Sequence, residues 1–438
     1  MNPPQKLLFD LLLPTASQQQ RSIVLPLKVS SPLKRCCCTA LTWGLAVILV
    51  TCTVLDVGDI VVGGYLGKYS GRINPLIGLA SYCATQIQFA SACPAIFFLI
   101  LGKRQIERTA ESLEALARSS DILRNPKEIL SSLRRLNFLS YFITLLGLIN
   151  ILSPLADIEA IIDDSESRSY FTFQLPLWAY LMQLRATYIP VFVVNYLVKI
   201  LFAYFMCFLY ESVEEFHRKM SSSVLTLRKQ KTPLQDGSYV ELLRAIRVEN
   251  QTIIDAFEQL QETFSLKLLL DLIGIVAGLC NAIAWFVVWL FGVGNALSSS
   301  GLNVSGVFRH LGLAFIDVSY LWLLLRKPIL LQSLHQRTTE LVEQIVLIRQ
   351  CSVIQVPSEV TLEEVALTSV TIEKLKSQKM LFRAGNVIEL GPPAIITILA
   401  GLLGFCCFVL ERADSFRRTA SNTDLQAVLG IRHHTDFN

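Results

Sequence analysis

The stretch KMLFRAGNVIELGPPAIITILAGLLGF, residues 379–405, decides the fold because it joins two kinds of sequence. A basic stretch of mixed polarity runs to Glu389, and Gly-Pro-Pro then opens an uncharged apolar run. Pro392 suits the first position of a helix, where an amide hydrogen would have no partner. The 19 residues that end at Leu410 make a helix about 28 Å long, enough to cross a bilayer. We therefore predict a membrane-spanning helix over 392–410.

The rest of the chain shares this apolar character. It is 52% hydrophobic and only 17% charged, which is too apolar for a soluble globular protein. A bilayer core about 30 Å thick needs roughly 20 apolar residues per helix. We predict an all-α polytopic membrane protein with seven transmembrane helices, over 39–62, 75–102, 137–156, 186–210, 268–294, 307–325 and 392–410. The stretch 171–184 is too short for an eighth, and it either extends the fourth helix outside the membrane or forms a half-inserted loop.

The positions of Lys and Arg predict the orientation. Twenty-nine of them lie in four alternate segments, against four in the three intervening loops. Positively charged loops stay in the cytoplasm, so we predict a cytoplasmic N-terminus and, with seven spans, an extracellular C-terminus. The four segments rich in Lys and Arg are 1–35, 103–135, 211–267 and 326–383. The four arginines of the tail oppose this orientation, but four segments outweigh one tail.

The predicted domain organisation follows from these spans. A cytoplasmic segment, 1–38, precedes six helices over 39–325, which carry cytoplasmic helical extensions at 103–135 and 211–267. Cytoplasmic anchor helices follow over 326–391, and an extracellular tail, 411–438, ends the chain. The anchor region contains two amphipathic helical stretches, 330–348 and 360–382, separated by Pro357.

A heptad seam runs along the connection between the fourth and fifth spans. Its members are spaced alternately three and four residues apart: Leu243, Ile246, Asn250, Ile253, Phe257, Leu260 and Phe264. This spacing is typical of a helix that buries one stripe against other helices. No Pro or Gly interrupts the stretch before the fifth span. We therefore expect one long helix, whose seam either covers the inner end of the membrane helices or joins subunits.

No enzyme signature is present. The chain has no P-loop, Gly-x-Ser-x-Gly, His-Glu-x-x-His or dinucleotide fingerprint, so we expect neither catalysis nor a cofactor, and no nucleic-acid partner. The three outer loops hold none of the 11 cysteines, which argues against a disulfide framework, and no cysteine spacing suits a metal. The Asn-x-Ser motif at Asn303 predicts glycosylation in an outer loop, whereas the Asn-x-Thr motif at Asn250 lies in an inner segment.

Charged residues inside membrane spans mark functional pathways. The candidates are Arg185, Lys199, Asp271 and Asp317. Arg185 and Lys199 lie toward the ends of their segments, where their side chains can reach the interface. No pair of broken helices in repeated halves indicates a transporter. A non-channel seven-helix scaffold or carrier nevertheless stays open as an alternative function.

Small residues form a stripe along the last predicted span. Ala394, Thr397, Gly401 and Gly404 are spaced i, i+3, i+7 and i+10, and so share one face. Such residues let helices approach closely within one subunit, which is their commoner use. They also leave room along an axis where several copies meet. The stripe by itself leaves both uses open.

At this point the sequence resembles the insect gustatory and odorant receptors. That family has seven spans, an inside N-terminus, a long fourth-to-fifth connection and a last helix in two parts. The stretch LFRAGNVIELGPPAIITILAGLLGFCCFVL, 381–410, resembles the junction of those parts, and Ala384-Gly385 stands where the family often has a small pair. The last span lacks the gustatory signature of Thr-Tyr followed by Gln-Phe. The resemblance, over about 39–411, is therefore to a divergent gustatory receptor-like protein.

The resemblance implies a ligand-gated, non-selective cation channel in the plasma membrane, surrounded by membrane lipid. It implies a homotetramer, or a heterotetramer with related receptor subunits, opened by a small-molecule tastant. The final span would line the pore, with the small-residue stripe toward the axis and Phe405 or Phe408 narrowing it. A ligand pocket would lie in the outer half of spans two to six, and we expect it to involve Tyr82, Gln86, Asn150, Tyr188, Trp285 and Asp317. An interhelical hydrogen bond is the structural alternative for each of these six.

Overall fold

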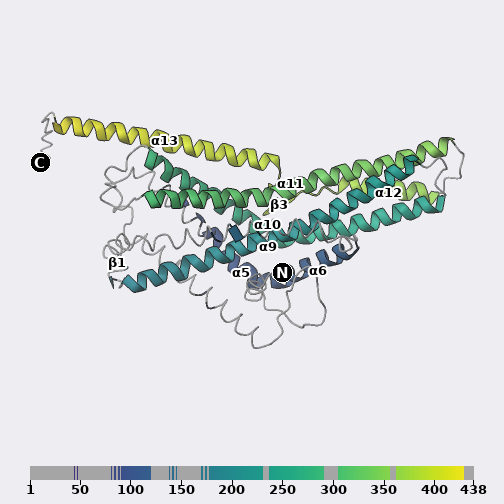
Figure 1. Ribbon diagram of the computed structural model, residues 1–438, viewed down its shortest axis with the longest axis horizontal. Coiled ribbons are helices and arrows are strands. Elements are labelled where there is room, and N and C mark those ends of the chain that lie inside the picture. Colours follow the sequence, from purple (N-terminus) through teal and green to yellow (C-terminus); the bar gives the residue numbers. More distant parts are fainter. Residues whose placement is uncertain are drawn as a thin grey trace.

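A computed structural model describes residues 90–119, 169–170, 173–174, 177–229, 236–290, 304–355 and 362–428, with isolated positions between 44 and 145. Long helices run side by side along the longest axis (Figure 1). The all-α class is confirmed for this part of the chain. The helices are α5 (Pro94–Leu101), α6 (Lys103–Ser119), α9 (Leu177–Lys229), α10 (Asp236–Leu290), α11 (Val304–Gln355), α12 (Leu362–Ser377) and α13 (Pro392–Val428).

Three of the described segments are long and apolar enough to cross a membrane. They are Val194–Arg228 in α9, Ser238–Val287 in α10 and Pro392–Ser415 in α13. These segments overlap the predicted fourth, fifth and seventh spans. The predicted sixth span is helical within α11, and most of the first three lies outside the described residues. The count of seven spans and the orientation of the termini therefore stay predictions.

The stretch before the fourth span extends its helix. A short antiparallel hairpin, β1 (Ser169–Tyr170) and β2 (Phe173–Gln174), precedes α9. The helix then begins at Leu177. Of the two alternatives for 171–184, the helical extension forms over 177–184.

Helix α10 is one continuous helix of 55 residues, as the seam predicted. Every seam residue is buried within the single chain, from Leu243 to Phe264. The Phe264 ring lies 5.2 Å from Phe98 and 5.4 Å from Phe202, centroid to centroid, and Phe257 lies 4.7 Å from Phe382. The seam thus holds α10 against its own subunit. Of the two alternatives for the seam, packing within the subunit is the one that forms, because all of its side chains are already buried there.

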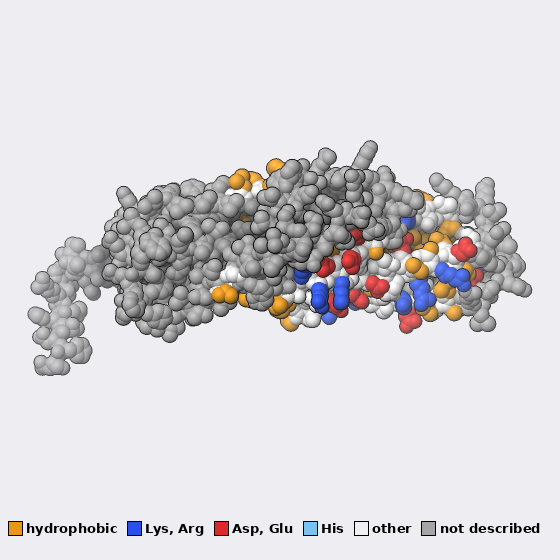
Figure 2. Space-filling view, turned by 90° about the horizontal axis from the view of Figure 1, so that it is seen from below, with side chains coloured by type: hydrophobic (Ala, Val, Ile, Leu, Met, Phe, Trp, Pro, Cys, Tyr) orange, Lys and Arg blue, Asp and Glu red, His pale blue; other side chains and the backbone are white. Residues whose placement is uncertain are grey.

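The two stretches that were predicted to follow the sixth span form α11 and α12. Helix α11 runs through Pro328 without a break, so the sixth span and the stretch 330–348 are one helix. A buried ion pair joins α11 to α12, with Arg349 Nε 2.9 Å from Glu364 Oε1. Figure 2 shows Lys, Arg, Asp and Glu side chains intermixed on the surface toward the end of the molecule where α12 lies. This end is the predicted cytoplasmic bundle.

A second hairpin connects this bundle to the last helix. Strand β3 (Arg383–Ala384) pairs with β4 (Ile388–Glu389), and the turn between them needs left-handed backbone at Gly385 (φ 61°) and Asn386 (φ 59°). The Gly385 amide donates to the Ser265 carbonyl at 2.7 Å. A Cβ at Gly385 would overlap the Leu269 side chain. The hairpin therefore docks on α10 where the fifth span begins, and this contact sets where α13 starts.

Helix α13 leaves the bundle on one side (Figure 1). It contacts mainly α10, and it runs as a helix well beyond Leu410, to Val428. The predicted tail, 411–438, therefore begins as a continuation of the helix.

Candidate functional site

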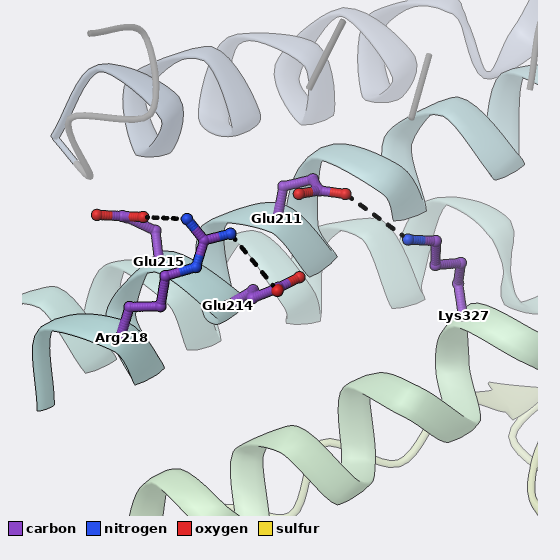
Figure 3. A network of polar contacts seen from close by, with 5 residues as sticks. All are labelled: Glu211, Glu214, Glu215, Arg218 and Lys327. Atoms are coloured by element: carbon purple, nitrogen blue, oxygen red, sulfur yellow. Dashed lines mark hydrogen bonds and ion pairs between the residues drawn. The ribbon is translucent and has the colours of Figure 1, made fainter. Parts of the chain in front are cut away.

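Charged residues gather where the predicted fourth and sixth spans end. Glu211 Oε1 on α9 lies 3.8 Å from Lys327 Nζ on α11 (Figure 3). Further along α9, Arg218 pairs with Glu214 at 3.5 Å and with Glu215 at 3.3 Å. Glu211 and Lys327, which follow the predicted ends of the fourth and sixth spans, are thus adjacent in space. The predicted ends of the fourth and sixth spans therefore lie at one level of the helix bundle.

The exposed surface of α13 is the first candidate site. In the segment Pro392–Ser415, only 11% of the most apolar 18-residue stretch is buried within the chain. The face toward α10 uses Ile395, Ile398 and Leu402, which pack against the main core. Further along, Val409 is fully buried beside Val287 of α10. The remaining surface is apolar and faces away from the subunit.

The small-residue stripe divides between these two surfaces. Ala394 is buried against the subunit, whereas Thr397, Gly401 and Gly404 are exposed. A Cβ added at Gly401 or Gly404 would meet no atom of the described residues within 4 Å. Among the described residues, therefore, no neighbour packs closely against Gly401 or Gly404, whereas Ala394 does pack within the subunit. Of the two aromatic candidates, Phe408 is exposed and Phe405 is half-buried.

A buried polar cluster between the helices is the second candidate site. Lys267 Nζ on α10 donates to Asn195 Oδ1 of α9 at 2.6 Å and also pairs with Asp271 one turn away. Gln88 Nε2 donates to Asp317 Oδ2 of α11 at 3.2 Å. Lys267, Asp271, Asn195 and Asp317 are all buried, so these contacts connect four helical segments away from solvent.

Lys199 belongs to the same cluster and does not reach the interface. It is only 4% exposed, and its Nζ lies 5.5 Å from the centroid of the Tyr196 ring and 5.0 Å from that of Tyr320. The two rings stack with centroids 4.9 Å apart and planes 14° apart. The expectation that Lys199 extends to the interface is wrong, because the ring faces hold its ammonium inside.

Two glycines of α10 make the cluster possible. A Cβ on Gly274 would overlap the Ser91 hydroxyl, and one on Gly278 would overlap Asp317 Oδ2. These glycines are four residues apart, the spacing of small residues that lets membrane helices approach closely. In the predicted fifth span, Gly274 and Gly278 thus have the close-packing role that was considered for the small residues of the last span.

The residues predicted for the ligand pocket are only partly placed. Tyr82, Gln86 and Asn150 lie outside the described residues, as does Asn303, and of Tyr188 only the helical backbone within α9 is described. Asp317 is in the polar cluster. Trp285 packs instead beside Val287 and Val409, in the small cluster that joins α10 to α13. The pocket as a set therefore stays a prediction.

Sequence reasoning missed several members of the polar cluster. Lys267 was counted as a cytoplasmic flank, although its i, i+4 spacing to Asp271 is that of a helical ion pair. The Gly274–Gly278 spacing was also readable from the sequence. Nothing in the sequence pointed to the contact between Gln88 and Asp317, because 229 positions separate them.

Comparisons with known proteins identify the fold. No family model and no curated protein matches the chain. The structure of the insect olfactory receptor OR5 from Machilis hrabei in complex with eugenol is similar, with a TM-score of 0.61 at 12% identity, over 93% of this chain and 97% of that chain. The structure of the same receptor described without eugenol has a TM-score of 0.60 at 13% identity and the same coverage. This protein has the fold of that receptor, which confirms the resemblance to insect chemoreceptors at the level of the fold.

Proposed function

We propose that this protein is a subunit of an oligomeric, ligand-gated cation channel of the insect chemoreceptor type, with α13 as the wall of its pore. The fold it shares with an olfactory receptor solved with a small molecule supports this proposal. The observation that carries it is the exposed apolar surface of α13, where a Cβ at Gly401 or Gly404 would meet no described atom within 4 Å. We therefore infer that lipid or neighbouring subunits cover the exposed apolar surface of α13.

The exposed surface of α13 has two adjoining sides. One carries large aliphatic side chains, Ile396, Leu399 and Leu403, exposed by 68%, 59% and 65%. These suit contact with lipid or with the neighbouring subunit. The other side carries Thr397 and the two exposed glycines. In a tetramer with α13 innermost, this second side faces the axis and leaves room for water.

Phe408 is the residue we propose as the narrowing of the pore. Its ring adjoins the small-residue side, and the Arg412 guanidinium lies 5.8 Å from its centroid. Phe405 lies 6.3 Å from it, centroid to centroid, but is turned toward α10. When each subunit contributes such an apolar side chain at the same level, the resulting constriction closes a pore by excluding water. Ala394, which is buried, is not part of the proposed wall.

Cysteine accessibility during current recording tests this function. In a protein whose native Cys406 and Cys407 are replaced by serine, single cysteines are introduced at Thr397, Gly401 and Gly404. Currents evoked by a panel of sugars and bitter compounds are recorded in the plasma membrane of an expressing cell. A charged, water-soluble thiol reagent should block the current at all three positions.

Matched controls lie on the opposite face of the same helix. Cysteine at Ile395, Ile398 or Leu402 packs against the core and should leave the current unchanged after the same reagent. Block on the buried face, or protection at all six positions while current flows, would place the conduction path elsewhere. A chain that reaches the surface and never conducts would favour the non-channel scaffold.

A further inference from the structure

One face of α11 carries a stripe of exposed apolar side chains along the predicted sixth span. Its members are spaced four, three and four residues apart, so they follow one side of the helix. They are Leu311, Phe315, Val318 and Trp322, exposed by 40%, 54%, 52% and 58%. The opposite side of the helix is buried in the subunit, for example at Ile316 and Tyr320. The stripe therefore requires an apolar partner from outside the described part of the chain.

A cation stands at the end of this stripe. Arg326 follows Trp322 by one turn and is exposed. The carbon of its guanidinium lies 5.3 Å from the centroid of the Trp322 ring. No hydrogen bond or ion pair joins Arg326 to another residue that the structure describes. The guanidinium thus keeps its donors for an anion.

The next cation of α11 has its partner inside the bundle. Lys327 Nζ lies 3.8 Å from Glu211 Oε1 of α9 (Figure 3). One turn further along α9, Glu214 pairs with Arg218 at 3.5 Å. The nearby carboxylates of α9 are therefore already paired with other cations. Of two consecutive cations, Lys327 is compensated within the subunit, whereas the charge of Arg326 calls for an anion outside the single chain.

The length of the stripe suits one leaflet of a bilayer. Arg326 comes 11 positions after Phe315, which is about 16 Å along a helix. One leaflet supplies about 15 Å of hydrocarbon, half of the bilayer core. Tryptophan favours the boundary between hydrocarbon and headgroups, where Trp322 then lies. Arginine binds phosphate through paired, charge-assisted hydrogen bonds. The face thus offers an apolar track for an acyl chain and a phosphate-binding cation at its end.

We propose that this face of α11 binds a phospholipid with a net negative headgroup. The phosphate accepts from Arg326, and an acyl chain lies along Trp322, Val318 and Phe315. A zwitterionic lipid also has a phosphate, but its own ammonium competes with Arg326 for that charge. The predicted orientation puts Arg326 at the cytoplasmic leaflet, which is rich in anionic lipids. The inference concerns the lipid around the subunit and does not depend on ion conduction.

Quenching of Trp322 fluorescence by lipids with brominated acyl chains tests the site. The full chain is placed in nanodiscs of unbrominated phosphatidylcholine. A small fraction of brominated phosphatidylserine is added to one sample, and brominated phosphatidylcholine to the matched sample. The Trp322 signal is the difference between each protein and the same protein with Trp322→Phe. Half of this signal should be quenched at an about fivefold lower mole fraction of the phosphatidylserine, as expected for one cation at a membrane surface.

Variants assign the headgroup contact. Arg326→Gln should remove the preference, so that the two brominated lipids quench equally. Arg326→Lys keeps the positive charge and should retain most of the preference. Arg337→Gln is the matched control, because Arg337 is exposed on the same face of α11 but lies about 16 Å further from the stripe. This control should keep the full fivefold preference.

Each outcome decides one part of the proposal. Equal quenching of the unaltered protein by the two lipids would overturn the negative headgroup. A preference that survives Arg326→Gln would overturn the assignment to Arg326. A folded protein whose Trp322 signal neither lipid quenches would mean that protein, such as a neighbouring subunit, covers the face, and would overturn the lipid site. None of these readouts records current, so a subunit that never conducts would refute the proposed function and leave this inference standing.

Discussion

Alanine in place of two helical glycines should have opposite effects on stability. At Gly278 the new Cβ would overlap Oδ2 of Asp317 and lie 2.6 Å from Nε2 of Gln88. At Gly401 it would meet no described atom within 4 Å. Both glycines lie inside apolar helices, so each variant is a matched control for the other.

The magnitudes follow from the contacts. Forcing a methyl group into a packed site costs about 1–3 kcal/mol, and losing a hydrogen bond to a charged acceptor costs about 1.5–3 kcal/mol more. Replacing a helical glycine with alanine returns about 1 kcal/mol. We expect Gly278→Ala to lower the free energy of unfolding by about 2–4 kcal/mol. Gly401→Ala should raise it by about 0.5–1 kcal/mol.

Unfolding of the purified variants in detergent, followed by tryptophan fluorescence, measures both effects. Equal stability of the two variants would refute the close approach of α10 to Gln88 and Asp317. A loss of stability in Gly401→Ala would show that α13 packs within the subunit after all. If α13 lines a pore, Gly401→Ala should still change the single-channel conductance.

Three further predictions concern the bundle, pH and topology. Phe257→Asp places a carboxylate where the ring packs 4.7 Å from Phe382, centroid to centroid, and gel filtration should show loss of the folded subunit; intact monomers would instead restore the intersubunit role of the seam. Burial lowers the pKa of His335 from its usual value of 6.5 to about 4, so the unfolded chain binds the proton first as pH falls. Stability present above pH 6.5 should therefore fall by up to about 3 kcal/mol toward pH 4, and His335→Leu, compared by urea unfolding, should lack that slope. With tags at both ends, the N-terminal tag alone should need permeabilisation for antibody access; if both need it, the span count is wrong.

Local patterns in the sequence predicted the helices well. The seam from Leu243 to Phe264 and the absence of Pro or Gly predicted one long helix, and α10 is that helix. Helix formation depends on hydrogen bonds four residues apart and on a stripe with helical period, both of which are visible in a short window. Helix α11 likewise follows its local helical pattern and continues through Pro328 without a break. The same short window could not show what the stripe packs against, so the sequence left open whether the seam packs within the subunit or between subunits.

The candidate sites were predicted less completely, for a related reason. Lys199 was expected at the interface because of its place along the span, but Tyr196 and Tyr320 hold it inside. Tyr320 lies on another helix, and only the packing of α9 against α11 brings its ring over Lys199. In the last span, Ala394 was grouped with Gly401 by spacing, although Ala394 is buried against the subunit and Gly401 is exposed.

By itself, the sequence predicted long helices, apolar segments of membrane-spanning length, and the start of the last helix at Pro392. Hydropathy summed along one helix reports the cost of leaving water, and that cost is independent of the neighbours. The tertiary structure alone decided which side of α13 is free, which charges are paired and where the glycines are needed. Those properties depend on how each helix is rotated about its own axis, and contacts between distant residues such as Gln88 and Asp317 set that rotation.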